Sequence, residues 1–152
     1  MKRSLTFFIL ALIATVIADD NDKILEGMAK EFEIEVSKLR ECLDEEGLLD
    51  LNTTMQKFDW NGTKEGNEDA KAELKPFCGF MACTMEKQSL MEGGKLATDK
   101  MIENIKERGN KRSEPQPPEE MLTNWKKCMN SLNENSQLTR EERACGLLQC
   151  FH

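Results

Sequence analysis

The chain has 152 residues, with 28 acidic against 21 basic side chains and a formal net charge of −7. The length favours one domain, and the acidic excess argues against a nucleic-acid partner, which would need a basic face. The sequence has a single histidine and no tyrosine, and no nucleophile stands beside a candidate base. We therefore expect a binding protein that uses no cofactor, not an enzyme.

The first 18 residues are typical of a secretory signal peptide. Two basic residues precede an almost entirely apolar run at 7–17, and small Ala18 stands before two aspartates. A membrane-spanning helix needs about 20 apolar residues, more than this run contains. We expect cleavage after Ala18 and a secreted, extracellular single domain at 19–152 with no stable membrane insertion. Its net charge is 19 − 28 = −9, because Lys2 and Arg3 are removed.

All six cysteines lie in the expected mature chain, at Cys42, Cys78, Cys83, Cys128, Cys145 and Cys150. An even number in a short secreted chain favours three disulfides. A zinc site is the alternative interpretation. It is disfavoured because the one histidine is the last residue and the sequence contains no Cys-x-x-Cys pair, so we expect no metal.

The first mature segment is predicted to be a helix that begins at Asn21 or Asp22, either of which can act as its cap. Its apolar residues recur at spacings of three and four, which indicates one helix face leading to Cys42: Leu25, Met28, Phe32, Val36 and Leu39.

The following segment is more polar. A short helix is expected near 48–55 and a loop at 58–67, where Asn-Gly indicates a turn. Asn52 and Asn61 each match the glycan acceptor pattern, which fits an exposed connection in a secreted protein.

The central helix is predicted at 77–91, starting after Pro76 and ended by the Gly93-Gly94 pair. No segment shows sustained strand alternation, so the fold class is all-α with five or six helices. Each later helix has local start or stop signals: one runs from Thr98-Asp99 to Gly109, one begins at Pro118, and the last opens with a capping box of Thr139 and Glu142 and reaches Cys150.

The cysteine spacing limits which sulfurs can pair. Residues five apart on a helix point about 140° away from one another, so Cys145 and Cys150 must bond different partners. The same holds for Cys78 and Cys83 if the helix is regular there. Six cysteines allow 15 pairings, and spacing alone does not choose among them.

The cysteine order is one, a close pair, one and another close pair after a signal peptide, and it resembles that of the insect odorant-binding (pheromone-binding) proteins. The stretch around the central helix and its exit resembles the same family: Cys83-Thr84-Met85-Glu86-Lys87, Leu90-Met91, Gly94-Lys95-Leu96 and Asp99-Lys100-Met101. The resemblance implies helices around an apolar cavity, cross-linked by three interlocked disulfides: Cys42–Cys83, Cys78–Cys145 and Cys128–Cys150.

Two spacings depart from the family pattern. Four residues separate Cys78 from Cys83 where the family usually has three, and four separate Cys145 from Cys150 where it usually has eight. The second departure preserves the divergence of the two side chains. For the first, we expect Gly79 to absorb the extra residue as a helix irregularity or a late helix start.

With this resemblance, the apolar helix faces become candidates for the wall of a ligand cavity, and their flexible methionines suit varied apolar shapes. Ordinary core filling is the alternative. The expected ligand-binding residues are Phe77, Phe80, Met81, Met101, Ile105, Trp125, Met129 and Leu148.

The function that the resemblance implies is extracellular binding and transport of a small hydrophobic ligand, such as an odorant, pheromone or fatty-acid-like lipid, by a monomer or weak homodimer. The alternative is a secreted venom, salivary or seminal protein that binds a protein or membrane partner. A saposin-like bundle fits the cysteine count but not this spacing. Without an internal histidine, any response of ligand affinity to pH is expected to be weak, or to come from carboxylates at lower pH.

Overall fold

The computed structural model describes residues 21–48, 51, 54 and 68–151, with the side chains of 68–73 excluded. The expected signal peptide, the loop at 58–67, most of the expected short helix at 48–55 and the glycan acceptors Asn52 and Asn61 lie outside the described residues.

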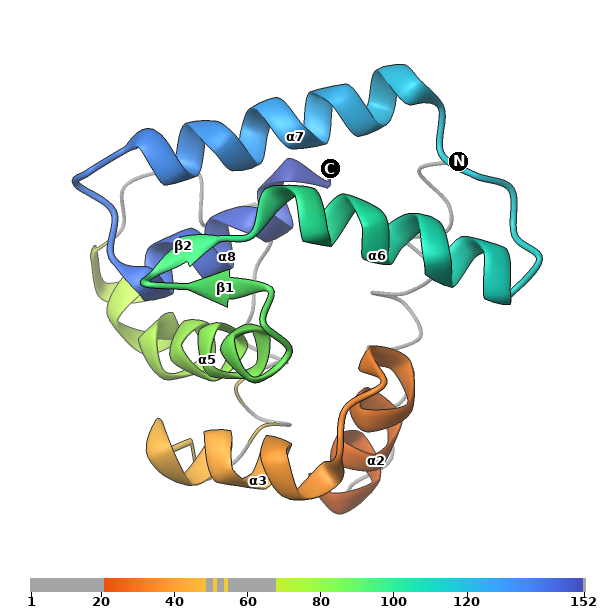
Figure 1. Cartoon of the computed structure of the whole chain (residues 1–152). Coiled ribbons are helices and arrows are strands. Elements are labelled where there is room, and N and C mark those ends of the chain that lie inside the picture. Colours follow the sequence, from red (N-terminus) through yellow and green to blue (C-terminus); the bar gives the residue numbers. More distant parts are fainter. Residues whose placement is uncertain (1–20, 49–50, 52–53, 55–67, 152) are drawn as a thin grey trace.

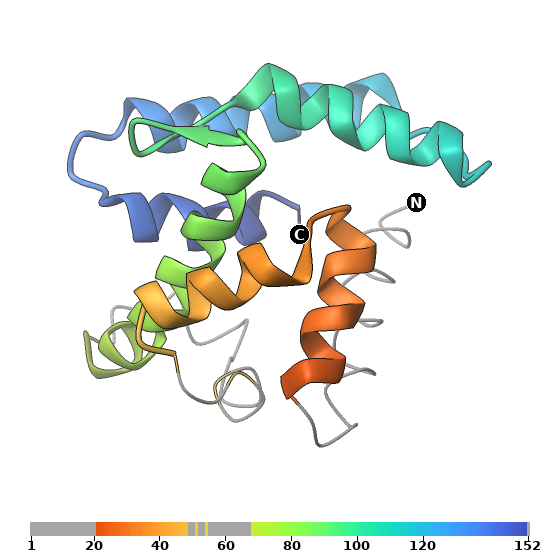
Figure 2. The same cartoon turned by 60° about the horizontal axis from the view of Figure 1, so that its bottom comes forward.

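The described chain is all-α, as predicted, with six helices and one two-stranded hairpin. Helices α6 and α7 lie side by side on one flank, α2 and α3 form the opposite flank, and α5 and α8 connect the two (Figures 1 and 2). The elements are α2 (Asn21–Phe32), α3 (Val36–Glu45), α5 (Glu68–Lys87), β1 (Met91–Glu92), β2 (Lys95–Leu96), α6 (Thr98–Lys111), α7 (Glu119–Glu134) and α8 (Arg140–Cys150).

The prediction of one continuous N-terminal helix was wrong, because the chain turns between α2 and α3. Glu33 adopts a left-handed φ of 52°, and the Ile34 amide donates to the Ala29 carbonyl at 3.0 Å. This is a Schellman ending, in which the residue after the helix is left-handed and the next amide closes back on the last turn. Cys42 therefore lies within α3.

Three further helices end in the same way. The left-handed residues have φ values of 65°, 58° and 55°, and each following amide donates to a carbonyl five residues earlier. They are Gly47 after α3, Ser89 after α5 and Ser113 after α6. Helix α5 thus ends at Lys87 rather than near 90–91, and α6 continues two residues past Gly109.

Gly93 and Gly94 do not stop a helix, as the sequence suggested, but form the turn of the β1–β2 hairpin. Both have positive φ, 59° and 77°, which is what a two-residue hairpin turn that matches strand twist requires. Met91 pairs with Leu96 across the ladder, and both side chains are buried. The hairpin therefore contributes apolar surface to the core.

Pro76 also departs from expectation, since it lies inside α5 rather than before it. A proline within a helix removes one backbone donor and crowds the preceding turn, yet the helix extends to Glu68 on its amino-terminal side.

By contrast, the start signals of α7 and α8 are confirmed. Pro118 is the N-cap of α7, and Thr139 and Glu142 form the reciprocal capping box of α8.

Three disulfides connect the helices, in the same pairs that the family resemblance implies. Cys42–Cys83 links α3 to α5, Cys78–Cys145 links α5 to α8, and Cys128–Cys150 links α7 to α8. Helices α2 and α6 contain no cysteine. The two helices without a covalent link therefore depend on noncovalent contacts for their positions.

Gly79 does not interrupt α5, contrary to expectation, because the helix runs from Glu68 to Lys87 through it. The extra residue between Cys78 and Cys83 is instead accommodated within a continuous helix. Five residues of helix turn the side chain by about 140°, which directs the two sulfurs to different neighbours. A Cβ on Gly79 would lie closer than 3.0 Å to the carboxylate of Glu46. This glycine provides room for a side chain from the end of α3.

Candidate ligand-binding interior

The buried apolar residues form two clusters. The upper cluster is built by the end of α5, the hairpin and helices α6, α7 and α8: Ala82, Met85, Met91, Leu96, Met101, Leu122, Trp125, Met129, Ala144, Leu147 and Cys150. The lower cluster is built mainly by α2, α3 and α5: Ile24, Leu25, Met28, Leu39, Cys42, Leu48, Leu51, Phe77, Phe80 and Cys83.

The residues expected to bind ligand divide between these clusters. In the upper cluster lie Met101, Trp125 and Met129, with Ile105 partly buried against it. In the lower cluster lie Phe77 and Phe80, with Leu148 partly buried against it.

Met81 is the member of the expected set that packs against both clusters. It stands on α5, the helix that joins the two flanks (Figure 2), and its side chain is only partly buried. Met129 and Phe80, by comparison, are fully buried. The other seven expected residues therefore divide between the two clusters, and Met81 lies at the boundary between these clusters.

The upper cluster is fixed by polar contacts at the turn between α7 and α8. Asn133 accepts from the Leu96 amide at 2.8 Å and donates to the Leu96 carbonyl at 2.9 Å, so its amide pairs with strand β2. The buried Arg143 donates to the carbonyls of Leu132, Gly94 and Asn135 at 3.1, 3.0 and 2.8 Å. These two side chains hold the hairpin against the helices.

Trp125 contacts the end of the chain. Its ring meets that of Phe151 edge to face, with centroids 5.1 Å apart and planes at 87°. This arrangement is favourable for two aromatic rings, and Phe151 is partly buried against the upper cluster. The residue after α8 thus adds to the apolar packing around the expected ligand residue Trp125.

Helices α2 and α6, which lack disulfides, are joined through the end of α2. The Phe32 carbonyl accepts from Gln88 at 2.5 Å and from Arg108 Nη2 at 3.0 Å. The Arg108 guanidinium lies 5.9 Å from the centroid of the Phe32 ring, a cation–π distance. We call this set of contacts the α2–α6 junction.

Two ion pairs flank the junction. Lys111 Nζ lies 3.2 Å from Glu33, and Arg112 Nη2 lies 2.8 Å from Glu31. The hydrogen bond to Glu31 raises the pKa of Arg112, whereas burial lowers the pKa of Arg108. Arg108 is the more deeply embedded of the two guanidinium groups.

Sequence patterns placed Phe32 on a helix face but did not indicate the α2–α6 junction. Arg108 follows Met101 and Ile105 at helical spacings of four and three, so it lies on the same face of α6. That continuation of an apolar stripe by an arginine was a usable signal. Its partner Phe32 is 76 residues away in the chain, and no local pattern indicates such a pairing.

Other kinds of site find no support in the part of the chain that the structure describes. No group of three or more metal-ligating side chains is present among those residues. None of the helices described there is long and apolar enough to cross a membrane.

The comparisons with known proteins agree with this architecture. The sequence profile of the PBP/GOBP family matches residues 28–152. Searches of curated proteins and of solved structures found no significant match. The matched family binds and transports small hydrophobic ligands, is not enzymatic, and consists of secreted proteins. With most of its length matched, the chain belongs to the PBP/GOBP family, the insect odorant- and pheromone-binding proteins.

Proposed function

We propose that this protein is an extracellular carrier that encloses a small apolar molecule between its two apolar clusters. The main support for this proposal is the position of Met81, which packs against both clusters while remaining partly buried. Methionine adapts to irregular apolar shapes, and removing apolar ligand surface from water supplies most of the affinity. The family membership supports the same function.

The eight expected ligand residues form the proposed wall of this site. Those on the lower side are Phe77, Phe80 and Leu148, and those on the upper side are Met101, Ile105, Trp125 and Met129, with Met81 between them. Three disulfides support the arrangement, because they hold α3, α5, α7 and α8 in place without requiring the interior to be filled by side chains.

Displacement of a fluorescent apolar probe from the oxidised protein tests the proposal. We expect saturable binding of about one probe per chain, with displacement by apolar competitors at micromolar levels. Met81→Trp, which adds volume at the boundary, should weaken binding about tenfold or more. Met121→Trp is the matched control. Met121 is also partly buried, but it packs against the upper cluster alone, whereas Met81 packs against both clusters.

Absence of probe binding by correctly bridged wild-type protein would refute the carrier function and direct the search to protein or membrane partners. Equal binding by wild type and Met81→Trp would leave a carrier whose site lies elsewhere. Size-exclusion chromatography of the same samples tests the proposed state, a monomer or weak homodimer.

The proposed carrier is also a processed, secreted protein. We propose that residues 1–18 are removed as a signal peptide, leaving one domain at 19–152, and that Asn52 and Asn61 are glycan acceptors. Mass spectrometry of protein secreted from insect cells checks both points. A mass for a chain beginning at Asp19, with a decrease on glycosidase treatment, is the expected result; an intact N-terminus would contradict the first point.

A further inference from the structure

The inner face of α6 carries a stripe that begins and ends with polar residues. Thr98, Met101, Ile105 and Arg108 follow one another at spacings of three, four and three, so they occupy one side of the helix. Met101 is buried and Ile105 is partly buried in the upper cluster. The guanidinium of Arg108 therefore stands at the end of an apolar track along the proposed site.

Arg108 connects a helix of the upper cluster to a residue that packs against the lower cluster. Its own stripe belongs to the upper cluster through Ile105, whereas the ring beneath its guanidinium is that of Phe32, which packs against the lower cluster. Arg108 Nη2 donates to the Phe32 carbonyl at 3.0 Å. The guanidinium is thus held in place by contacts made independently of any ligand.

One donor of this guanidinium has no hydrogen-bond partner among the residues that the structure describes. Arg108 Nε is buried and makes no hydrogen bond with the described residues. Buried N–H groups are paired in the great majority of cases, and an exception needs an explanation. The buried Thr98 hydroxyl also lacks a partner within the described part of the chain. It is uncharged, however, and stands at the other end of the stripe, about 15 Å along the helix axis.

The positive charge of Arg108 is also not balanced by an ion pair with any of the described carboxylates. The nearest carboxylates have closer cations, because Glu31 pairs with Arg112 at 2.8 Å and Glu33 with Lys111 at 3.2 Å. The polar and aromatic contacts that Arg108 makes with the described residues are to a neutral carbonyl and an aromatic face. A half-buried guanidinium in this setting favours an anionic acceptor, and the lowered pKa of Arg108 that results from its partial burial agrees with that preference.

We infer that the carried molecule is an amphiphile with a carboxylate head, which accepts a hydrogen bond from Arg108 Nε while its apolar chain lies along Met101 and Ile105. The inference rests on the proposed carrier function and names its ligand class. One free N–H matches a single carboxylate oxygen, whereas an alcohol would provide an acceptor without the charge.

The ligand-side test needs no variant. Dodecanoic acid, its methyl ester and dodecanol compete with a neutral apolar probe on the oxidised wild-type protein at pH 7. The acid should displace the probe at a concentration about tenfold lower than the ester or the alcohol, as expected for a charge-assisted hydrogen bond. Equal displacement by all three would overturn the inference and leave the carrier function intact. Failure of the probe itself to bind would instead refute the carrier function.

The protein-side test uses Arg108→Met with Arg112→Met as its matched control. Both variants remove one guanidinium from the same end of α6, but Arg112 Nη2 already bonds Glu31. Arg108→Met should reduce the acid-to-ester preference to about one while neutral ligands still bind, and Arg112→Met should retain the preference. Loss of the preference in both variants would indicate a general charge effect and contradict the assigned contact. If Arg108→Met does not fold, as judged by circular dichroism, the wild-type ligand comparison decides the question.

Discussion

The side-chain amide of Asn133 pairs with both backbone groups of Leu96, accepting at 2.8 Å and donating at 2.9 Å. Asn133 thereby acts as an additional strand residue beside β2, although it stands on α7. The contact is partly buried and connects the end of α7 to the hairpin that follows α5. The position of the buried Leu96 side chain is thus linked to a polar residue 37 positions later.

Asn133→Ala should lower the free energy of unfolding by about 2 kcal/mol, because two hydrogen bonds of about 1 kcal/mol each are lost and backbone groups of Leu96 lose their partners. Urea unfolding followed by circular dichroism measures the change. Asn130→Ala is the control, since Asn130 is exposed on the same helix and should change stability by less than about 0.5 kcal/mol. Equal effects of the two substitutions would show that the Leu96 contact does not stabilise the fold.

Arg143→Met should have a larger effect. The guanidinium donates to three carbonyls from two parts of the chain, and its residue is 8% exposed. Methionine preserves part of the apolar volume but leaves the three acceptors without this donor, so we expect a loss of about 3 kcal/mol. Thermal and urea unfolding provide the measurement.

Arg40→Met is the control for Arg143→Met. Arg40 pairs with Asp22 at 3.0 Å, but its side chain is 55% exposed, and exposed ion pairs contribute between about 0 and 1 kcal/mol. A loss in Arg143→Met no greater than that in Arg40→Met would contradict the structural role assigned to the buried guanidinium.

These contacts show which parts of the fold the sequence could predict. The starts of α7 and α8 were predictable because their signals are local: Pro118 fits a helix start, and Thr139 and Glu142 satisfy each other within one turn. The hydrophobic spacing also predicted the helical class. Each of these signals lies within a few residues of the structure it specifies.

The helix ends were less predictable. Glu33, Ser89 and Ser113 take the left-handed position that glycine usually occupies, so composition did not indicate them. The apolar spacing of Met28, Phe32 and Val36 continues across the turn between α2 and α3, and periodicity therefore could not reveal the break. The hydrogen bonds that close these turns join backbone groups, which residues of many types can supply.

The residue types of the candidate site were predictable, but the division of these residues between two clusters was not. The expected ligand residues are apolar members of regular helix faces, yet their assignment to two clusters depends on how α5 and α8 cross. The α2–α6 junction involves Phe32 and Arg108, which only the folded chain brings together. Polar groups that act across such separations leave little trace in a single sequence.

Glu141 should make the stability of α8 depend on pH. Hydrogen bonding to a backbone N–H, opposed by burial and supported by Arg140, lowers the pKa of Glu141 in the folded protein below its ordinary value of 4.5. A carboxyl group whose pKa is lower when folded contributes stability above its unfolded pKa, and loses that contribution as the pH falls through its folded pKa.

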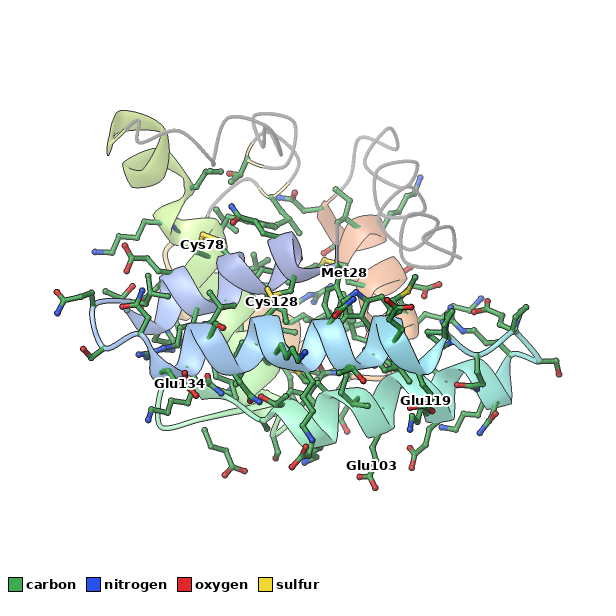
Figure 3. The ribbon with its side chains drawn as sticks, turned by 90° about the horizontal axis from the view of Figure 1, so that it is seen from above. Met28, Cys78, Glu103, Glu119, Cys128 and Glu134 are labelled. Carbon is green, nitrogen blue, oxygen red and sulfur yellow. A yellow bond between two sulfur atoms is a disulfide. The ribbon has the colours of Figure 1, made fainter. Side chains whose placement is uncertain are left out.

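Glu141→Gln should therefore lower the free energy of unfolding at pH 7 by about 0.5–1 kcal/mol, the usual contribution of an acid in the first turn of a helix, and should have less effect at pH values below the folded pKa. Urea unfolding across the acid range measures both. Glu103→Gln is the control, because Glu103 is exposed in the middle of α6 and points away from the rest of the chain (Figure 3). A pH-independent effect of Glu141→Gln would rule out the proposed carboxylate contribution.

Two of the disulfides offer a matched comparison of chain entropy. Cys78–Cys145 closes a separation of 67 residues and Cys128–Cys150 one of 22. In each bond one residue is 8% exposed and the other is partly buried. Similar burial means that replacing each pair by alanine should create similar packing defects, leaving loop length as the main difference.

Because loop-closure entropy grows with the logarithm of loop length, removing Cys78–Cys145 should cost about 1 kcal/mol more than removing Cys128–Cys150. Each double alanine variant is unfolded in urea beside the wild type, with the remaining bonds verified by mass spectrometry. The opposite order would mean that native contacts, such as the packing of Cys150 in the upper cluster, outweigh the constraint on the unfolded chain. The expected order would instead show that the difference between the two bonds follows the loop-closure entropy of the unfolded chain.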